Sequence, residues 1–351
     1  MPSPDLRTEV LPHLGEHRGA WDRLVATQPV PSPFLRSWWV DHAAAGDVAI
    51  VACFDGADLV GGAAFELDRW GRGPARLERV RAIGQGVLGP DHLDLVATPE
   101  HHLGVARAVL TWLRRPGSRV VDLDGLTAAG SLATLLAPHE VERTAAPFAD
   151  LSGGSEQYLA GRPGKVRSTI SRSAKRLTRS GVELVTVDRD DIDAALDDLA
   201  RLHDQRWAED SVFLQGWERF CAAARAGAAT GDVVVHELRD TEGEAVAVEL
   251  DLVLGSSIAF YQAGRRTERE WRGCGSVLRA RIIEASALAG ATEYDLLRGD
   301  EGYKADWATD RRDLVRCTMG VGVLGIAAVR ARSLRQWIDR RRATASEELS
   351  P

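Results

Sequence analysis

Two separate stretches of the chain share one alternation of apolar and polar positions. Residues 48–69 (VAIVACFDGADLVGGAAFELDR) and residues 233–254 (VVVHELRDTEGEAVAVELDLVL) each contain two apolar runs joined by a short polar segment rich in turn residues. Strand-like runs on either side of turn residues predict a β-hairpin in each stretch.

Each predicted hairpin is followed by an apolar helix pattern, a break that contains glycine, and a strand pattern. These lie at 106–126 in the first half of the chain and at 279–299 in the second. The repeated order of hairpin, helix and strand predicts a mixed α/β fold built from two copies of one unit, although hairpins and helix–strand pairs are common enough for chance to compete.

The stretch between the two copies is rich in Gly, Pro and Ser. Residues 145–164 (AAPFADLSGGSEQYLAGRPG) are typical of a connector. A chain of 351 residues is also longer than one typical domain. We therefore expect two domains, residues 1–150 and residues 151–351.

Composition narrows the class of protein. Hydrophobic residues make up 44% and charged residues 27% of the chain, which is typical of a globular protein. The net charge of −7 argues against a general nucleic-acid-binding protein, and against DNA binding in particular, but leaves room for a local basic patch. The four cysteines have no CxxC spacing, which predicts a reduced, cytoplasmic protein without a zinc site. The N-terminus lacks a signal-peptide pattern, and the apolar run 317–329 is too short to form a transmembrane segment.

A glycine-rich turn precedes the second predicted helix. In residues 269–290 (REWRGCGSVLRARIIEASALAG), Gly273 and Gly275 stand just before Ser276, which we expect to cap a helix that ends near Ala289. Such a turn exposes backbone N–H groups at the positive end of a helix, which favours a phosphate or pyrophosphate group. The alternative is that the glycines only relieve steric crowding.

A basic helix is predicted at residues 162–181, which hold seven Lys and Arg residues and no acid. The functional interpretation is a surface for donor phosphates, a nucleotide-linked acceptor, an anionic glycan or tRNA. The alternative is a solvated face neutralised by the acidic run 188–198. A second basic stretch, 329–342, predicts a peripheral helix.

The segment 294–314 (YDLLRGDEGYKADWATDRRDL) starts as a short strand, breaks at Gly299 and then becomes polar. Strand ends that open into polar loops often hold binding or catalytic groups, whereas acidic residues at an exposed helix start are the simpler interpretation. Glu249 and Asp251 stand two apart on a predicted strand, so their side chains share one face of the sheet.

The order of strands, glycine turn, helix and strand resembles the acyl-CoA core of the GNAT acyltransferase superfamily. That superfamily has the motif Gln/Arg-x-x-Gly-x-Gly/Ala, and residues 270–275 (EWRGCG) match its two glycines but carry Glu270 at the first position. The chain further resembles the CelD-like branch, which is associated with polysaccharide biosynthesis. The residues that carry this resemblance are PFLRSWW (33–39), PDHLDLV (90–96), KVRSTISRSAKRL (165–177) and YDLLRGDEGYKADW (294–307).

That branch is in turn similar to the Fem peptidyltransferases, which have tandem GNAT-like domains and use aminoacyl-tRNA. Residues 303–307 (YKADW) are the plausible counterpart of their Phe-Lys-x-x-Phe motif. The resemblance therefore implies two tandem GNAT-like domains, the first shaping the acceptor side and the second binding the acyl donor.

The resemblance also implies an N-acyltransferase that moves an acyl group, such as acetyl, from acyl-CoA to an amine of a polysaccharide precursor or small metabolite. Its implied site residues fall into three sets. The donor would bind at Arg272, Gly273, Cys274, Gly275 and Ser276; the catalytic candidates are Glu249, Asp300, Tyr303 and Lys304; the substrate-binding candidates are Asp251, Arg298, Glu301 and Trp307.

The same resemblance implies roles for individual residues and leaves two alternative functions open. Asp300 and Glu301 are candidates for the base or for binding a cationic acceptor, Tyr303 would protonate the leaving thiolate, and Lys304 would hold a phosphate or stabilise negative charge. One alternative is a transferase that uses aminoacyl-tRNA. The other is a non-catalytic glycan-assembly protein with a degenerate GNAT fold, which Glu270 favours.

Overall fold

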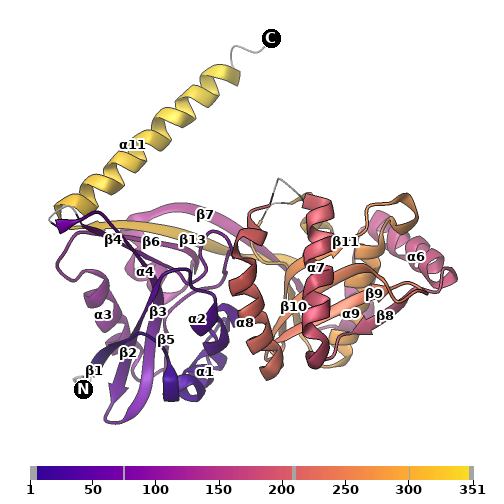
Figure 1. The fold of residues 1–351 in the computed structure, drawn as a ribbon, viewed down its shortest axis with the longest axis horizontal. Helices are drawn as coiled ribbons and strands as arrows, with labels where there is room; N and C mark the ends of the chain where they lie inside the picture. Colours follow the sequence, from indigo (N-terminus) through magenta and orange to yellow (C-terminus); the bar gives the residue numbers. More distant parts are fainter. Residues whose placement is uncertain (1–5, 74–75, 208–210, 300, 348–351) are drawn as a thin grey trace.

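The strands of the protein form one continuous, twisted sheet that runs through two lobes (Figure 1). The computed structural model describes residues 6–73, 76–207, 211–299 and 301–347. In the part of the chain so described the sheet has 13 strands, in the order β1-β2-β3-β4-β6-β13-β7-β12-β11-β10-β9-β8, with β5 paired to β3.

The first half of the chain builds most of the left lobe of Figure 1. Its elements are β1 (Arg7–Leu11), α1 (Arg18–Ala26), α2 (Ser37–His42), β2 (Asp47–Asp55), β3 (Asp58–Trp70), β4 (Leu77–Arg81), β5 (Val96–Ala97), α3 (His102–Leu113), β6 (Arg119–Thr127), α4 (Ser131–Leu135) and β7 (Glu140–Asp150).

The second half repeats this order after two additional helices. Its elements are α5 (Gly154–Ala160), α6 (Gly164–Arg179), β8 (Glu183–Thr186), α7 (Ile192–Trp207), α8 (Trp217–Thr230), β9 (Val233–Arg239), β10 (Ala245–Leu254), β11 (Ser257–Arg265), α9 (Cys274–Leu288), β12 (Glu293–Asp295), α10 (Gly302–Trp307), β13 (Asp310–Val321) and α11 (Gly322–Glu347). Both halves have a strand, two helices, a run of strands, a helix, a strand, a short helix and a long strand; the run holds β2–β5 in the first half and β9–β11 in the second. The predicted duplication and mixed α/β fold are therefore confirmed.

The last strand of each half pairs with the other half. Strand β13 lies between β6 and β7, while β7 pairs with β12 of the second half. The prediction of a connector at 145–164 is wrong, because 145–150 complete β7 and 154–160 form α5. Small residues and a proline conceal that strand in the sequence. The domain boundary at residue 150 stays a prediction. A single boundary there would separate β13 from the two strands of the first half with which it pairs.

The helices of the second half cover both faces of its sheet. Helices α7 and α8 pack on one face, and their apolar residues belong to the same core cluster as the first half of the chain. Helices α5, α6 and α9 pack on the other face around a second cluster. The first core therefore continues from one half into the other, which fixes how the halves meet.

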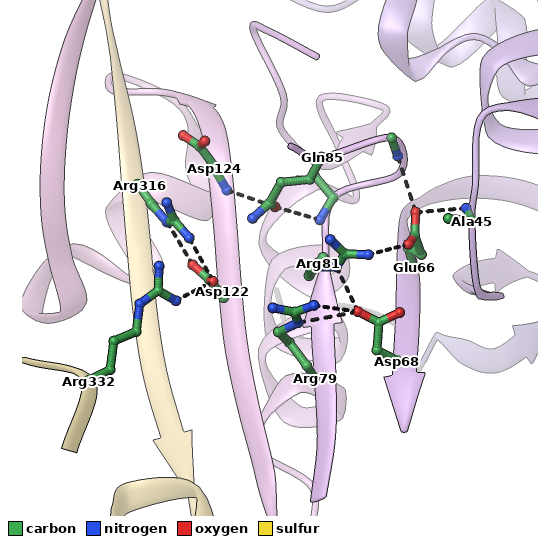
Figure 2. Close-up of polar contacts among 12 residues, drawn as sticks. Ala45, Glu66, Asp68, Arg79, Arg81, Gln85, Asp122, Asp124, Arg316 and Arg332 are labelled. Atoms are coloured by element: carbon green, nitrogen blue, oxygen red, sulfur yellow. Dashed lines mark hydrogen bonds and ion pairs between the residues drawn. The ribbon is translucent and has the colours of Figure 1, made fainter. Parts of the chain in front are cut away.

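Helix α11 leaves the first lobe as a long projecting helix (Figure 1). Near its base, Arg332 Nη1 donates a hydrogen bond to the buried Asp122 carboxylate on β6 at 2.7 Å, and Arg316 on β13 donates two more at 2.8 Å (Figure 2). Burial alone would raise the pKa of Asp122, but the hydrogen bonds and charges of Arg316 and Arg332 outweigh it and lower the pKa to about 2. No helix among the described residues is both long and apolar enough to cross a membrane.

Because Asp122 titrates below its ordinary value of 3.8, its ion pairs stabilise the fold above that value and lose this effect as the pH falls toward 2. We expect Asp122→Asn to lower the free energy of unfolding by about 2 kcal/mol at pH 7, and the difference from wild type to shrink as the pH falls from about 5 to about 2. Urea unfolding across this pH range measures the difference in the free energy of unfolding, and substitution of an exposed carboxylate, Asp190→Asn, is the control. A pH-independent difference would contradict the assignment.

Candidate active site

A cavity of about 430 Å³ opens beside the glycine turn at the start of α9. Its walls come from α6, α7, β10, β11, α9 and α10. Of the residues predicted to bind the donor, it is lined by Arg272, Gly273, Gly275 and Ser276. We call it the glycine-turn cavity.

The glycine turn is shaped by close contact with α6. Gly273 has a left-handed backbone (φ +83°), and a Cβ there would lie 2.4 Å from Ser173 Oγ. Gly273 is the N-cap of α9, so the prediction that Ser276 caps the helix is wrong; Ser276 lies inside the first turn. The Cys274 side chain is fully buried, with Sγ 3.8 Å from the Val246 carbonyl oxygen, and this residue is not among those that line the cavity.

The basic helix predicted at 162–181 is α6, which lies against α9. Among the described residues, the six cations of α6 have no ion pair with a carboxylate; these are Lys165, Arg167, Arg172, Lys175, Arg176 and Arg179. The acidic run 188–198 does not neutralise them, because its Asp193 and Asp198 pair with arginines on α7, α8 and β9. The mouth of the glycine-turn cavity is therefore bordered by a positively charged helix.

A second cavity, of about 390 Å³, lies where the two halves of the chain meet. Val87, Leu88 and Asp91 line it from the first half, and α7, β11 and the segment 296–304 line it from the second. We call it the interface cavity. It shares four lining residues with the glycine-turn cavity, namely Arg206, Phe260, Ala263 and Tyr303. The two cavities therefore meet at a junction formed by α7, β11 and α10.

Four charged residues connect the halves beside the interface cavity, and we call them the latch; Asp91, His92 and Asp295 are buried, and the Arg298 side chain is 24% exposed. The backbone N–H of Arg298 donates to Asp91 at 2.6 Å and its Nε donates to the same carboxylate, while His92 Nε2 lies 2.7 Å from Asp295 Oδ2. Burial would lower the pKa of His92 and raise that of Asp295, but each partner's charge outweighs burial, so the His92 pKa is raised and the Asp295 pKa is lowered. Gly125 permits this contact, since a Cβ there would lie 2.3 Å from the Pro90 carbonyl oxygen.

The latch holds a loop with an unusual backbone. In the described part of the chain, His92 and Leu297 are the non-glycine residues with positive φ, at +54° and +56°. Such conformations cost about 1–3 kcal/mol each and persist only where surrounding contacts enforce them. Asp295 Oδ1 supplies one such contact by accepting a hydrogen bond from the Leu297 N–H at 2.7 Å.

Lys304 braces the same loop from inside. It is buried, its ammonium donates to the carbonyl oxygens of Leu297 and Arg298, and it lies 3.0 Å from Glu301. Lys304 and Glu301 line the interface cavity and not the glycine turn. Asp300, the first catalytic candidate, lies outside the described residues.

The two carboxylates predicted to share a sheet face do so. The Tyr294 hydroxyl donates to Glu249 Oε1 and lies 3.4 Å from Asp251 Oδ1. Both carboxylates are fully buried; Glu249 lines the glycine-turn cavity, whereas Asp251 does not. Burial, followed by the charge of Glu249, raises the pKa of Asp251 well above its ordinary value.

Sequence reasoning missed one residue of this cluster, Arg279 on α9. Its Nη2 donates to Glu249 Oε2 at 3.1 Å, and its guanidinium lies 3.9 Å from the Phe260 ring centroid and 5.8 Å from that of Trp307. The available signal was position: Arg279 stands three and four residues before Ile282 and Ile283 and so shares their buried face. A cation on an apolar helix stripe needs a buried partner. Among the described residues no group of three or more His, Cys, Asp or Glu could hold a metal ion.

Comparison with known proteins agrees with this architecture. Residues 164–305 match the profile of a family described as an acetyltransferase (GNAT) domain. The match begins at α6 and covers every residue that lines the glycine-turn cavity except Asp306 and Trp307. No curated protein sequence matches the chain.

Solved structures extend the likeness to both halves. FemX superposes with a TM-score of 0.61 at 11% identity, over 88% of this chain and 96% of FemX. The C-terminal domain of a putative lysylphosphatidylglycerol synthetase from Agrobacterium fabrum gives 0.56 at 13%, over 91% and 96%. A tandem GNAT protein from the clavulanic acid biosynthesis pathway gives 0.50 at 15%, over 91% and 99%. The chain therefore has a tandem GNAT fold, and its residues 164–305 match a GNAT domain.

The latch generates a prediction about stability. Removing one partner of a buried ion pair leaves the other charge unpaired, so we expect Asp91→Ala to lower the free energy of unfolding by about 3–5 kcal/mol. Arg298→Ala should be comparably destabilising, and the double variant should lose clearly less than the sum of the two. Urea unfolding of the wild type, the two single variants and the double variant gives the interaction energy between Asp91 and Arg298. Additive losses would mean that Asp91 and Arg298 do not stabilise each other.

Proposed function

We propose that the protein is an N-acyltransferase that transfers an acyl group, acetyl in the simplest case, from acyl-CoA to an amine. One observation carries the proposal: the glycine-turn cavity and the interface cavity meet at four shared lining residues, Arg206, Phe260, Ala263 and Tyr303. A transferase that joins two substrates by direct attack needs such a meeting point, because the reacting atoms must come within about 3–3.5 Å of each other.

The glycine-turn cavity suits the donor. The N–H groups of the first turn of α9 and the positive end of the helix dipole favour a pyrophosphate. Lys165, Arg265 and Arg272 add positive charge to the same lining. Glu270, which departs from the GNAT motif, is exposed and is not among the residues that line this cavity, so its charge does not occupy the anion site.

The interface cavity suits the acceptor. Its lining contains residues of both halves, apolar side chains such as Leu88 and Phe213, and the partly exposed carboxylate of Glu301. In the proposed reaction Glu301 binds a cationic acceptor, and Tyr303, at the junction, protonates the leaving thiolate. Burial raises the pKa of Tyr303, which keeps its hydroxyl protonated at neutral pH. The acceptor we propose is an amine of a polysaccharide precursor or of a small metabolite.

A second candidate function is transfer from aminoacyl-tRNA, as the resemblance to Fem transferases implies. The observation that favours it is the row of unpaired cations on α6 beside the glycine-turn cavity. A polyanion would bind there with strong salt dependence. The glycine turn favours CoA, so we rank acyl-CoA first. A non-catalytic glycan-assembly protein is the third candidate.

Blocking the glycine turn tests the donor assignment. We expect acetyl-CoA to bind wild type with a micromolar dissociation constant and Gly275→Trp to abolish binding, because the indole fills the turn. Leu288→Trp is the matched control, since it places the same side chain on α9 at a position that is 87% exposed. Isothermal titration calorimetry with acetyl-CoA and longer acyl-CoAs measures this.

Three outcomes are informative. Loss of acetyl-CoA binding in Gly275→Trp, with binding retained in wild type and in Leu288→Trp, supports the CoA assignment. Absence of any acyl-CoA binding to wild type, together with salt-dependent binding of aminoacyl-tRNA, supports the second candidate. Absence of both supports the non-catalytic candidate.

The acceptor assignment predicts a different kinetic change. Glu301→Gln should raise the KM for a cationic amine about tenfold or more while the KM for acyl-CoA stays within about twofold, because Glu301 lines only the interface cavity. Glu284→Gln, at an exposed position of α9, is the control. A parallel rise in both KM values would contradict the separation of the two sites.

A further inference from the structure

We infer that Arg279 stabilises the negative charge that develops on the acyl carbonyl oxygen during transfer, and that Glu249 positions Arg279 and is not the base. The inference rests on the proposed acyl transfer and applies to an acyl-CoA thioester and an aminoacyl-tRNA ester alike, since both pass through the same oxyanion.

The position of Arg279 carries the first part of the argument. Arg279 lines the glycine-turn cavity, and its guanidinium carbon lies 3.9 Å from the ring centroid of Phe260 and 5.3 Å from that of Tyr303. Both aromatic residues belong to the four that the two cavities share. Arg279 is therefore a cation packed against the point where donor and acceptor meet, and Arg206 of α7 is a second one.

The hydrogen bonds of Arg279 carry the second part. Its side chain is 9% exposed, and within the described chain its Nε has no hydrogen-bond partner. A buried N–H without a partner costs about 1–3 kcal/mol, so such a group calls for an explanation. A carbonyl oxygen of the donor would supply the missing acceptor.

The surroundings keep the guanidinium charged and aligned. Burial alone would lower its pKa, but the Glu249 carboxylate outweighs burial and raises it. The rings of Phe260, Tyr303 and Trp307 contact its faces, which limits rotation of the planar group. A charge held in place before the reaction stabilises an oxyanion without the cost of reorganising.

Glu249 is engaged on both oxygens. Oε2 accepts from Arg279 at 3.1 Å, and Oε1 accepts from the Tyr294 hydroxyl. Each oxygen keeps a further lone pair, but a general base must lie within hydrogen-bond reach of the amine, and Glu249 is not among the residues that line the interface cavity, where we place the acceptor. The geometry instead makes Glu249 the residue that fixes Arg279.

The proposed step balances as follows. The amine nitrogen forms a bond to the acyl carbon, and the carbonyl π electrons move to the oxygen, which accepts hydrogen bonds from Arg279. The carbonyl re-forms as the carbon–sulfur bond breaks, and sulfur leaves with the electron pair. Tyr303 gives its hydroxyl proton to the thiolate, and the proton released by the new ammonium group, passed on through water, restores Tyr303.

The test follows release of the CoA thiol from acetyl-CoA, with hydroxylamine as a surrogate acceptor that is neutral at pH 7. We expect Arg279→Gln to lower kcat by about 10²- to 10³-fold while the dissociation constant of acetyl-CoA changes by less than about threefold. Arg279→Lys should recover part of kcat. Arg281→Gln, on the same helix but outside both cavity linings, should behave as wild type.

Glu249→Gln separates positioning from base catalysis. A positioning role predicts a fall in kcat of about tenfold and a pH–rate profile of unchanged shape. If Glu249 is the base, its loss removes the acidic limb of that profile, where the rate falls as the base becomes protonated, and this result would overturn the second half of the inference.

The remaining outcomes are equally decisive. Full kcat in Arg279→Gln, or a loss that lies wholly in acetyl-CoA affinity, overturns the role of Arg279. Thermal unfolding shows whether Arg279→Gln folds. If it does not, Arg279→Lys is used in its place. An unchanged kcat together with weakened acetyl-CoA binding in Arg279→Lys would overturn the inference. In each of these cases, the proposed function stands if the wild-type protein binds acetyl-CoA and releases the CoA thiol. If the wild-type protein neither binds nor turns over acetyl-CoA or aminoacyl-tRNA, both the proposed function and the role of Arg279 are overturned.

Discussion

The contact between Asp91 and Arg298 is the interaction on which the candidate site depends. It joins a turn of the first half to the loop after β12, and both partners line the interface cavity. Buried charges cost several kcal/mol to desolvate and repay this only where geometry and extra hydrogen bonds are good. Here Asp124 lies 2.9 Å from Arg298 Nη1 and the His92–Asp295 pair lies alongside, so the loop can hold its positive-φ residue and keep Tyr303 at the junction.

Much of the fold could be predicted because its signals are local. The hairpins, the helix–strand pairs and the basic helix each fall within a few dozen residues, and their periodicity is visible in one stretch of sequence. The latch is a different kind of feature, since its partners are 207 residues apart. The sequence marks PDHLDLV and YDLLRGDEGYKADW as unusual, yet nothing local indicates that they contact each other.

The segment PFLRSWW also makes contacts with distant parts of the chain that its own sequence does not indicate. Trp38 Nε1 donates to Asp232 of the second half at 2.9 Å, and Trp39 is fully buried near Tyr261. Motifs that resemble a functional signature thus include residues whose contacts are structural. The position of the glycine turn before a helix was predicted correctly, whereas Ser276 was misjudged because Gly273 already forms the cap. Arg279 was overlooked because its partner Glu249 lies on β10, distant in sequence from α9.

The exchange of β7 and β13 has a consequence for synthesis on the ribosome. The sheet of the first half has a vacant edge beside β6 until residues 310–321 leave the exit tunnel, since β13 is the strand that pairs there. Domains that fold as they emerge can bury their edges early, but this N-terminal half must wait for nearly the whole chain. Its exposed strand edge is a hazard for aggregation during that interval. A ribosome that stalls before β13 would therefore release a sheet with an open edge, and not a finished first domain.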